Sequence, residues 1–215
     1  MSRIAIVGGH GKIALRAAAI LTAHGHEVTS LIRKPEQRSD SENAGASASI
    51  IDLESASIDE LARVFHGHDA VVFSAGAGGG APERTYAVDR DAAIRTMNAA
   101  KAANVERYVM VSYLGAGPDH SVPEGDSFYA YAESKAEADT YLKGGDLAWT
   151  ILGPSMLSDD PETGSIQVDP SESGSVSRGN VAQVIAAVLA DESTVRRTIE
   201  FIDGPTPIRD AVAAK

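Results

Sequence analysis

The sequence contains no cysteine among its 215 residues. This absence excludes disulfide bonds, thiol catalysis and cysteine-ligated metal sites, and it fits a reducing compartment. Apolar runs of membrane-spanning length are also lacking, and the first apolar run, IAIV, is four residues long before it meets GGHGK. That run predicts a strand entering a loop rather than a signal peptide. We therefore expect a cytoplasmic protein that spans no membrane.

Positive charge is scarce. The chain has 19 lysine and arginine residues against 30 aspartate and glutamate residues, which gives a net charge of −11. Lysine and arginine never form a run longer than two residues. Because phosphate backbones and anionic lipid surfaces repel such a chain, its composition disfavours nucleic-acid and membrane partners. A small molecule is the partner that we expect.

Strand-like and helix-like segments alternate along the chain, which is typical of an α/β fold. Such alternation implies right-handed crossovers and a Rossmann-type, doubly wound, mostly parallel sheet with helices on both faces. The pattern predicts strands at 3–9, 26–34, 48–54, 68–76, 107–115, 147–157 and 196–204, and helices at 12–25, 57–67, 86–105, 127–145 and 180–191.

No linker divides the sequence, so residues 1–215 are predicted to form a single domain. One segment differs from the rest in composition, because it is polar and rich in serine and glycine. It predicts a small substrate-side excursion from the sheet at about 153–180. Within it we expect at most two short strands, at 164–168 and 174–178. The glycine-rich stretch GAGGGAPE at 76–83 predicts a flexible loop.

Two similar stretches, AHGHEV and FHGHDA, place a His-Gly-His sequence where a helix passes into a strand. These histidines raise the question of a metal site. The favoured interpretation is helix capping, with Gly25 and Gly67 at the helix ends and His24 and His66 beside the negative helix termini. No metal site is therefore expected, since no histidine pair has helical ligand spacing.

The first predicted strand runs directly into GGHGKIA, which opens a helix. Read as Gly-x-x-Gly-x-x-Ala, Gly8 makes the tight turn, Gly11 lets a pyrophosphate approach the backbone, and Ala14 lets helix and strand pack closely. The helix start then offers free amide groups to an anion. We expect this loop to contact a dinucleotide through Gly8, His10, Gly11, Lys12 and Ile13.

The ends of the next three strands carry the predicted rest of the dinucleotide site. Arg33 and Lys34 stand at the end of the second strand, where NAD-binding proteins tend to have a carboxylate. A guanidinium can hold a 2′-phosphate that a carboxylate would repel, so NADP(H) is the expected cofactor. After the third and fourth strands we expect Asp52 and Leu53 near the adenine, and Ser74, Ala75 and Gly76 along the cofactor.

A candidate catalytic set follows in chain order. Ser112 ends the fifth strand, and Tyr131 precedes Lys135 by four residues, one helical turn. An ammonium beside a phenol is expected to lower its pKa, so that Tyr131 protonates a carbonyl oxygen while Ser112 hydrogen-bonds it. Lys135 is also expected to hold ribose hydroxyls. Taken singly, each residue has an ordinary structural explanation: a strand end, a packed ring, a solvated cation.

Together, the Gly8/Gly11/Ala14 loop, Arg33, the serine, tyrosine and lysine set, and ILGPSML at 151–157 resemble the atypical short-chain dehydrogenase/reductases with an NAD(P)-binding, NmrA-like fold. The resemblance covers essentially the whole chain. It implies NADP(H) binding, catalytic positions at Ser112, Tyr131 and Lys135, and a cofactor contact at Pro154.

Members of that group include reductases of flavins and quinones, sugar-nucleotide epimerases, and NADP(H)-sensing proteins with little or no catalysis. Three hypotheses follow from the resemblance. The first is an NADPH-dependent oxidoreductase that reduces a small carbonyl, quinone or flavin. The second is a non-catalytic NADP(H) sensor, and the third is a sugar-nucleotide epimerase or dehydratase. A homodimer is among the expected assemblies, because apolar helices on such sheets often pair.

Overall fold

The computed structural model describes residues 1–78 and 81–213. Its main sheet has the strand order β11-β8-β10-β6-β5-β4-β1-β2-β3, and the run from β10 to β3 is parallel throughout. Antiparallel β8 and β11 complete one edge. The strands are β1 Arg3–Val7, β2 Glu27–Ile32, β3 Ser47–Ile50, β4 Ala70–Phe73, β5 Arg107–Val111, β6 Ala148–Pro154, β7 Met156–Ser158, β8 Ser165–Val168, β9 Ser175–Ser177, β10 Arg197–Asp203 and β11 Thr206–Pro207.

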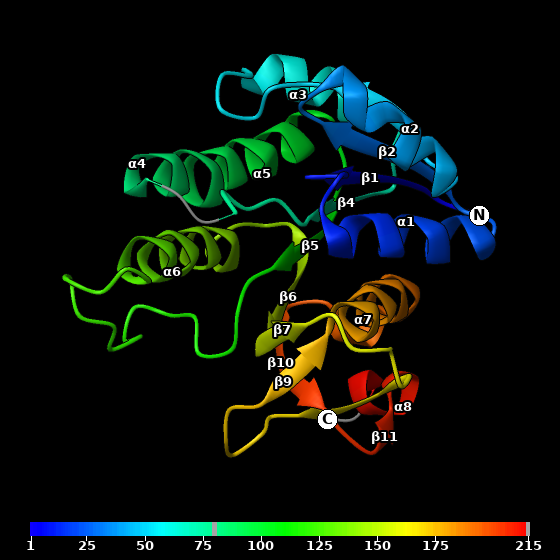
Figure 1. Cartoon of the computed structure of the whole chain (residues 1–215). Coiled ribbons are helices and arrows are strands. Elements are labelled where there is room, and N and C mark those ends of the chain that lie inside the picture. The colour runs from blue at the N-terminus through cyan, green and yellow to red at the C-terminus, as the bar shows by residue number, and fades with distance from the viewer. Residues whose placement is uncertain (79–80, 214–215) are drawn as a thin grey trace.

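Helices cover both faces of this sheet (Figure 1). One apolar core lies between the sheet and α1, α7 and α8, and a second lies between the sheet and α3, α5 and α6. Both faces of β4 are therefore buried, as a continuous apolar run in a parallel sheet requires. The helices are α1 Lys12–Ala23, η1 Pro35–Gln37, α2 Arg38–Asn43, α3 Ile58–Phe65, α4 Pro82–Thr85, η2 Tyr86–Ala92, α5 Ala93–Ala102, α6 Tyr129–Lys143, α7 Arg178–Ala190, η3 Glu192–Thr194 and α8 Ile208–Ala213.

The strand order reverses between β1 and β4, which lie side by side although β2, β3 and the helices α1, η1, α2 and α3 separate them in the sequence. In open parallel sheets, ligands bind beyond the carboxyl ends of the strands at such a switch point. Val7 and Phe73 pair there as the last residues of β1 and β4. The predicted Rossmann-type fold is confirmed.

Several predicted local signals are confirmed by the backbone. Gly25 and Gly67 follow α1 and α3 with φ of +82° and +76°, which are conformations that glycine adopts without strain. Ser57 and Glu60 form a capping box at the start of α3. The structure adds short elements that the sequence pattern missed, notably α2 and α8, whose brevity leaves little periodicity to detect.

The predicted helix at 86–105 begins earlier and is not uniform. It starts with α4, continues as a wide π turn in η2, and becomes regular in α5. The π turn carries the buried side chain of Asp89. Of the predicted loop at 76–83, Gly79 and Gly80 lie outside the described residues.

The segment at 153–180 is only partly an excursion. β7 pairs with β9 in a separate two-stranded sheet, whereas β8 joins the main sheet beside β10. Buried Asn180 holds this region in place, because its Oδ1 accepts hydrogen bonds from Thr163 and Gly164 and its Nδ2 donates to Asp203. Within residues 1–78 and 81–213, each helix is too short or too polar to cross a lipid bilayer.

Candidate functional site

The loop between β1 and α1 is held by one backbone hydrogen bond to β2 and one within the loop. The amide of Gly9 donates to Leu31 O at 2.8 Å, and that of Gly11 donates to Gly8 O at 2.9 Å. Gly8 has a φ of +80°, and a Cβ there would lie 2.5 Å from Ala75 Cα. The loop can therefore lie against the end of β4 only with glycine at this position.

Gly11 is the N-cap of α1, and within the part of the chain that the structure describes no side chain caps the first amides of this helix. Those amides are free to bind an anion, as the loop pattern predicts. Ile13 packs its side chain into the core, so only its backbone can contribute to such a site. The ammonium of Lys12 instead forms an ion pair with Asp159 at 2.6 Å.

A cleft of about 260 Å³ opens beyond the ends of β1, β2, β3 and β4. It joins residues that are far apart in the sequence but were predicted to meet at this edge. The predicted residues that line it are Gly8, His10, Gly11, Arg33, Asp52, Leu53, Ser74, Ala75 and Gly76. The predicted site residues outside its lining are Lys12, Ile13, Lys34, Ser112, Tyr131, Lys135 and Pro154.

Two of the predicted residues outside the cleft have clear structural positions. Lys34 extends an exposed side chain, and its backbone amide and carbonyl both hydrogen-bond to a cleft residue, Gln37. Pro154 is buried as the last residue of β6, and its carbonyl accepts a hydrogen bond from the amide of Leu114 at 2.9 Å.

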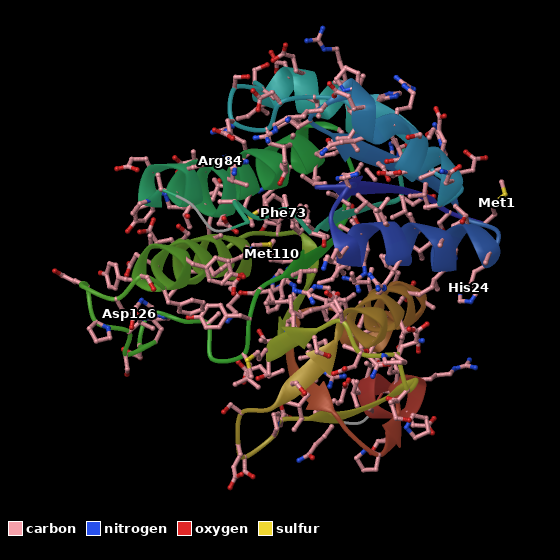
Figure 2. All side chains as sticks on the ribbon, in the orientation of Figure 1. Met1, His24, Phe73, Arg84, Met110 and Asp126 are labelled. Carbon is pink, nitrogen blue, oxygen red and sulfur yellow. The ribbon has the colours of Figure 1, made fainter. Side chains whose placement is uncertain are left out.

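Glu54 was not predicted, yet it joins the two arginines that line the cleft. Its Oε1 lies 3.0 Å from Arg84 Nε and 3.6 Å from Arg33 Nη1. Arg84, which is labelled in Figure 2, also donates to the carbonyl of Ala77 at 2.7 Å. The position of Arg84 in a short helix after a glycine-rich loop gave no periodic signal that could have identified it.

Gln37 was also missed. Its Oε1 accepts the backbone amides of Arg33 and Lys34 at 3.1 and 3.0 Å, and its Nε2 lies 3.2 Å from His10 Nδ1. His10 Nε2 in turn lies 2.7 Å from a carboxylate oxygen of Asp40. The turn after β2 is thereby connected to the loop after β1. A signal was present, since a proline followed by glutamine two residues later is consistent with a helix start.

Lys135 is almost fully buried, with 1% of its surface exposed. Its ammonium donates to Val111 O at 3.0 Å and lies 3.5 Å from Asp89 Oδ1. Burial by itself lowers the pKa of Lys135, but the facing oxygens of Tyr131, Asp89 and Asp139 outweigh burial and raise it. The lysine therefore carries its charge at neutral pH.

Asp89 connects this lysine to the cleft. One of its carboxylate oxygens accepts the amide of Ala77 at 2.9 Å, while the other faces Lys135. A Cβ on Gly76, which lines the cleft, would come within 3.3 Å of that second oxygen. Asp89 thus links Lys135 to the backbone that follows β4 beside the cleft.

Tyr131 lies beside Lys135, whose ammonium is 5.6 Å from the centre of the tyrosine ring. Burial raises the pKa of Tyr131 and outweighs the lowering effect of Lys135. The lowered pKa expected from the sequence is therefore wrong, because that expectation counted the charge and not the burial. Tyr131 is a neutral phenol at neutral pH, and a neutral phenol can donate a proton.

Two more aromatic rings surround this phenol. Tyr113 and Phe128 have ring centres 5.6 and 5.2 Å from that of Tyr131. Tyr113 follows β5 and Phe128 precedes α6, so the group forms where these two elements meet. The phenol therefore has an aromatic environment.

Ser112 is buried and donates its hydroxyl to Asp139 Oδ2 at 2.6 Å. Burial raises the pKa of Asp139 to about 6, and the hydrogen bond from Ser112 opposes this rise. The importance of Asp139 was missed, although a signal existed. Tyr131, Lys135 and Asp139 are spaced four residues apart, which places all three on the same side of α6.

We expect Gly8→Ala to destabilise the protein by more than the roughly 1 to 2 kcal/mol that a left-handed backbone alone costs. The added Cβ must also displace the Ala75 backbone, and the displaced loop should bind a dinucleotide at least about tenfold more weakly. Urea unfolding and calorimetric titration with NADPH measure both effects. Gly25→Ala is the matched control, since Gly25 has a similar φ but a Cβ there would meet no atom of the described residues within 4 Å. Equal losses in the two variants would contradict this interpretation.

Asp89→Asn removes the negative partner of a buried ammonium. Breaking one side of such a pair costs about 3 to 5 kcal/mol, and urea unfolding at pH 7 should show a loss of that size. Asp91→Asn is the control, because Asp91 lies in the same π turn in a partly exposed pair with Arg90 and should cost under about 1 kcal/mol. If the two variants unfold alike, Asp89 does not hold Lys135 in solution.

Comparisons with known proteins agree with this geometry. The sequence model of the NAD(P)H-binding family matches residues 8–192. The chain is 33% identical over 213 residues to a Bacillus subtilis protein named as the uncharacterized sugar epimerase YhfK, and the alignment covers 98% of each protein.

Two solved structures are similar over nearly their whole length. A Bacillus halodurans protein, described as a candidate NAD-dependent epimerase/dehydratase, superposes with a TM-score of 0.91 at 32% identity and covers 99% of both chains. The oxidoreductase ylbE of Lactococcus lactis superposes with a TM-score of 0.88 at 28% identity, covering 98% of this chain and 94% of its own. The resemblance to atypical short-chain dehydrogenase/reductases is confirmed, and the chain belongs to the NAD(P)H-binding family.

Proposed function

We propose that this protein is an NADPH-dependent oxidoreductase that reduces a small carbonyl, quinone or flavin. The observation that carries the proposal is the neutral phenol of Tyr131 beside the buried, charged ammonium of Lys135. Both lie where α6 meets the carboxyl end of β5, next to the switch point of the sheet. A bound NADPH supplies a hydride, so the protein has to supply the proton.

Tyr131 is the proposed proton donor. As hydride reaches the substrate carbon, the phenol passes its proton to the substrate oxygen, and solvent later restores that proton. The positive charge of Lys135 stabilises the phenolate that forms transiently. Tyr113 and Phe128 surround the phenol with aromatic surface, which favours a flat, unsaturated substrate.

The preference for NADP(H) over NAD(H) is assigned to Arg33. Its guanidinium lines the cleft at the end of β2, where NAD-binding proteins tend to have a carboxylate. The phosphate-binding amides belong to the loop at Gly8 and Gly11, and Asp52 and Leu53 are proposed to meet the adenine. Ser74, Ala75 and Gly76 are proposed to line the rest of the dinucleotide.

Sugar-nucleotide epimerisation is the second candidate, because the names of two close relatives suggest it. The same tyrosine and lysine could move a proton in that reaction. An epimerase returns its hydride to the substrate, so NADPH would not be consumed. Consumption of NADPH therefore separates the two candidates.

Arg33→Ala is expected to weaken NADPH binding by at least about tenfold, because a charge-assisted hydrogen bond contributes about 1.5 to 3 kcal/mol. NADH binding should hardly change, since NADH has no 2′-phosphate. Calorimetric titration measures both affinities. Arg38→Ala is the control, because Arg38 pairs with Glu42 on exposed surface and does not line the cleft. Equal losses of NADPH and NADH affinity would show that Arg33 does not recognise the 2′-phosphate.

Tyr131→Phe tests the chemistry. Wild-type protein should consume NADPH with members of a panel of quinones, flavins and small carbonyls, and the variant should reduce carbonyls about 10² to 10⁴ times more slowly. Tyr141→Phe is the control on the same helix, since its hydroxyl donates to Asn98 Oδ1 on exposed surface.

The remaining outcomes separate the alternatives. Unchanged turnover of a quinone or flavin in Tyr131→Phe would indicate direct hydride transfer without a protein acid. Tight NADPH binding with no turnover of any compound would favour a cofactor sensor. Interconversion of a sugar nucleotide without net NADPH consumption would favour the epimerase.

A further inference from the structure

The hydrogen bond between Ser112 and Asp139 restricts what the serine can do. A serine hydroxyl has one proton, and an ionised carboxylate can only accept. Because Ser112 Oγ lies 2.6 Å from Asp139 Oδ2, the serine proton lies in that bond while Asp139 is ionised. Ser112 then offers only lone pairs to other groups. It cannot donate to a substrate oxygen in that state.

Asp139 is placed in surroundings that favour its neutral form. Only 2% of its surface is exposed, and its buried Oδ1 has no hydrogen-bond partner among residues 1–78 and 81–213. An unpartnered buried oxygen is much less costly on a neutral acid than on a carboxylate. The charged and titratable groups that act on it are Tyr131, Lys135 and Lys143 of α6, Tyr108 of β5, Tyr113 after β5 and, through Lys135, Asp89 of η2.

We propose that Asp139 is a positioning residue whose protonation reverses the direction of its hydrogen bond with Ser112. In the neutral acid, Asp139 donates to Ser112 Oγ, and the serine proton turns towards the substrate oxygen. This inference rests on the proposed carbonyl reduction. No extra proton is consumed, since Tyr131 still supplies the one that reaches the substrate and the proton of Asp139 stays in its bond to Ser112.

The reversal of the hydrogen bond between Asp139 and Ser112 makes the rate of carbonyl reduction depend on pH. The pKa of Asp139 is about 6, so the donating arrangement of Ser112 is present below that pH and is lost as the pH rises through it. A hydrogen-bond donor to a developing oxyanion contributes about 10²- to 10³-fold to the rate. The kcat/KM of the wild-type protein should therefore fall about tenfold for each pH unit above 6, until turnover without serine donation takes over.

The first experiment measures kcat/KM for a carbonyl substrate with NADPH from pH 5 to 8.5. Asp139→Asn should give a flat profile at the acidic level of the wild type, because the amide can donate to Ser112 at every pH. Ser112→Ala should be slow throughout. Glu137→Gln, on the exposed side of α6, should keep the wild-type profile. A wild-type slope in Asp139→Asn, or a rate as low as that of Ser112→Ala, would overturn the proposal.

The second experiment needs no turnover and so separates this inference from the proposed function. Carbon-13 NMR follows the side-chain carboxyl of Asp139 through a pH titration, with Asp139→Asn identifying its signal. Since Ser112 stabilises the ionised form, Ser112→Ala should raise the pKa of Asp139 above its wild-type value. An unchanged pKa would mean that the bond is absent in solution, and the proposal fails. A raised pKa without activity on any substrate would refute only the reductase.

Discussion

An ammonium enclosed away from water must be matched by negative charge and hydrogen-bond acceptors, and the site of this protein is arranged around that requirement. Lys135 meets it with Asp89 and the carbonyl of Val111. Such a pair adds little net stability, because the cost of desolvating both charges offsets their attraction. The pair instead fixes positions. It holds the lysine at the end of β5, and Asp89 of the π turn also accepts a hydrogen bond from the amide of Ala77.

The three acidic or basic side chains on one side of α6 show how burial and charge compete. Burial dominates for Tyr131 and Asp139, so both favour their neutral forms more than free side chains do. Charge dominates for Lys135, which stays an ammonium. The helix therefore presents a neutral phenol, a fixed cation and a carboxyl group with a pKa of about 6, in successive turns.

The local part of this architecture could be predicted from the sequence. The dinucleotide loop, the alternation of strands and helices, and the glycine ends of α1 and α3 depend on residues close together in the chain. The strand ends could also be placed, because parallel strands must end at one edge. Asp89 and Glu54 were missed because their roles depend on contacts across the fold: Asp89 reaching Lys135, and Glu54 reaching Arg84. The predicted direction of the Tyr131 pKa shift was wrong, because the four-residue spacing indicates a nearby charge but not the burial of the phenol.

The contacts of Gln37 have a consequence for how cofactor preference can evolve. Gln37 holds the turn after β2 through the backbone amides of Arg33 and Lys34, not through their side chains. The shape of the turn is therefore independent of which side chains it presents. With the role proposed for Arg33, cofactor preference could be exchanged by a point substitution while Gln37 still holds the backbone of the turn, so a lineage built on this fold could move between the two nicotinamide pools of the cell.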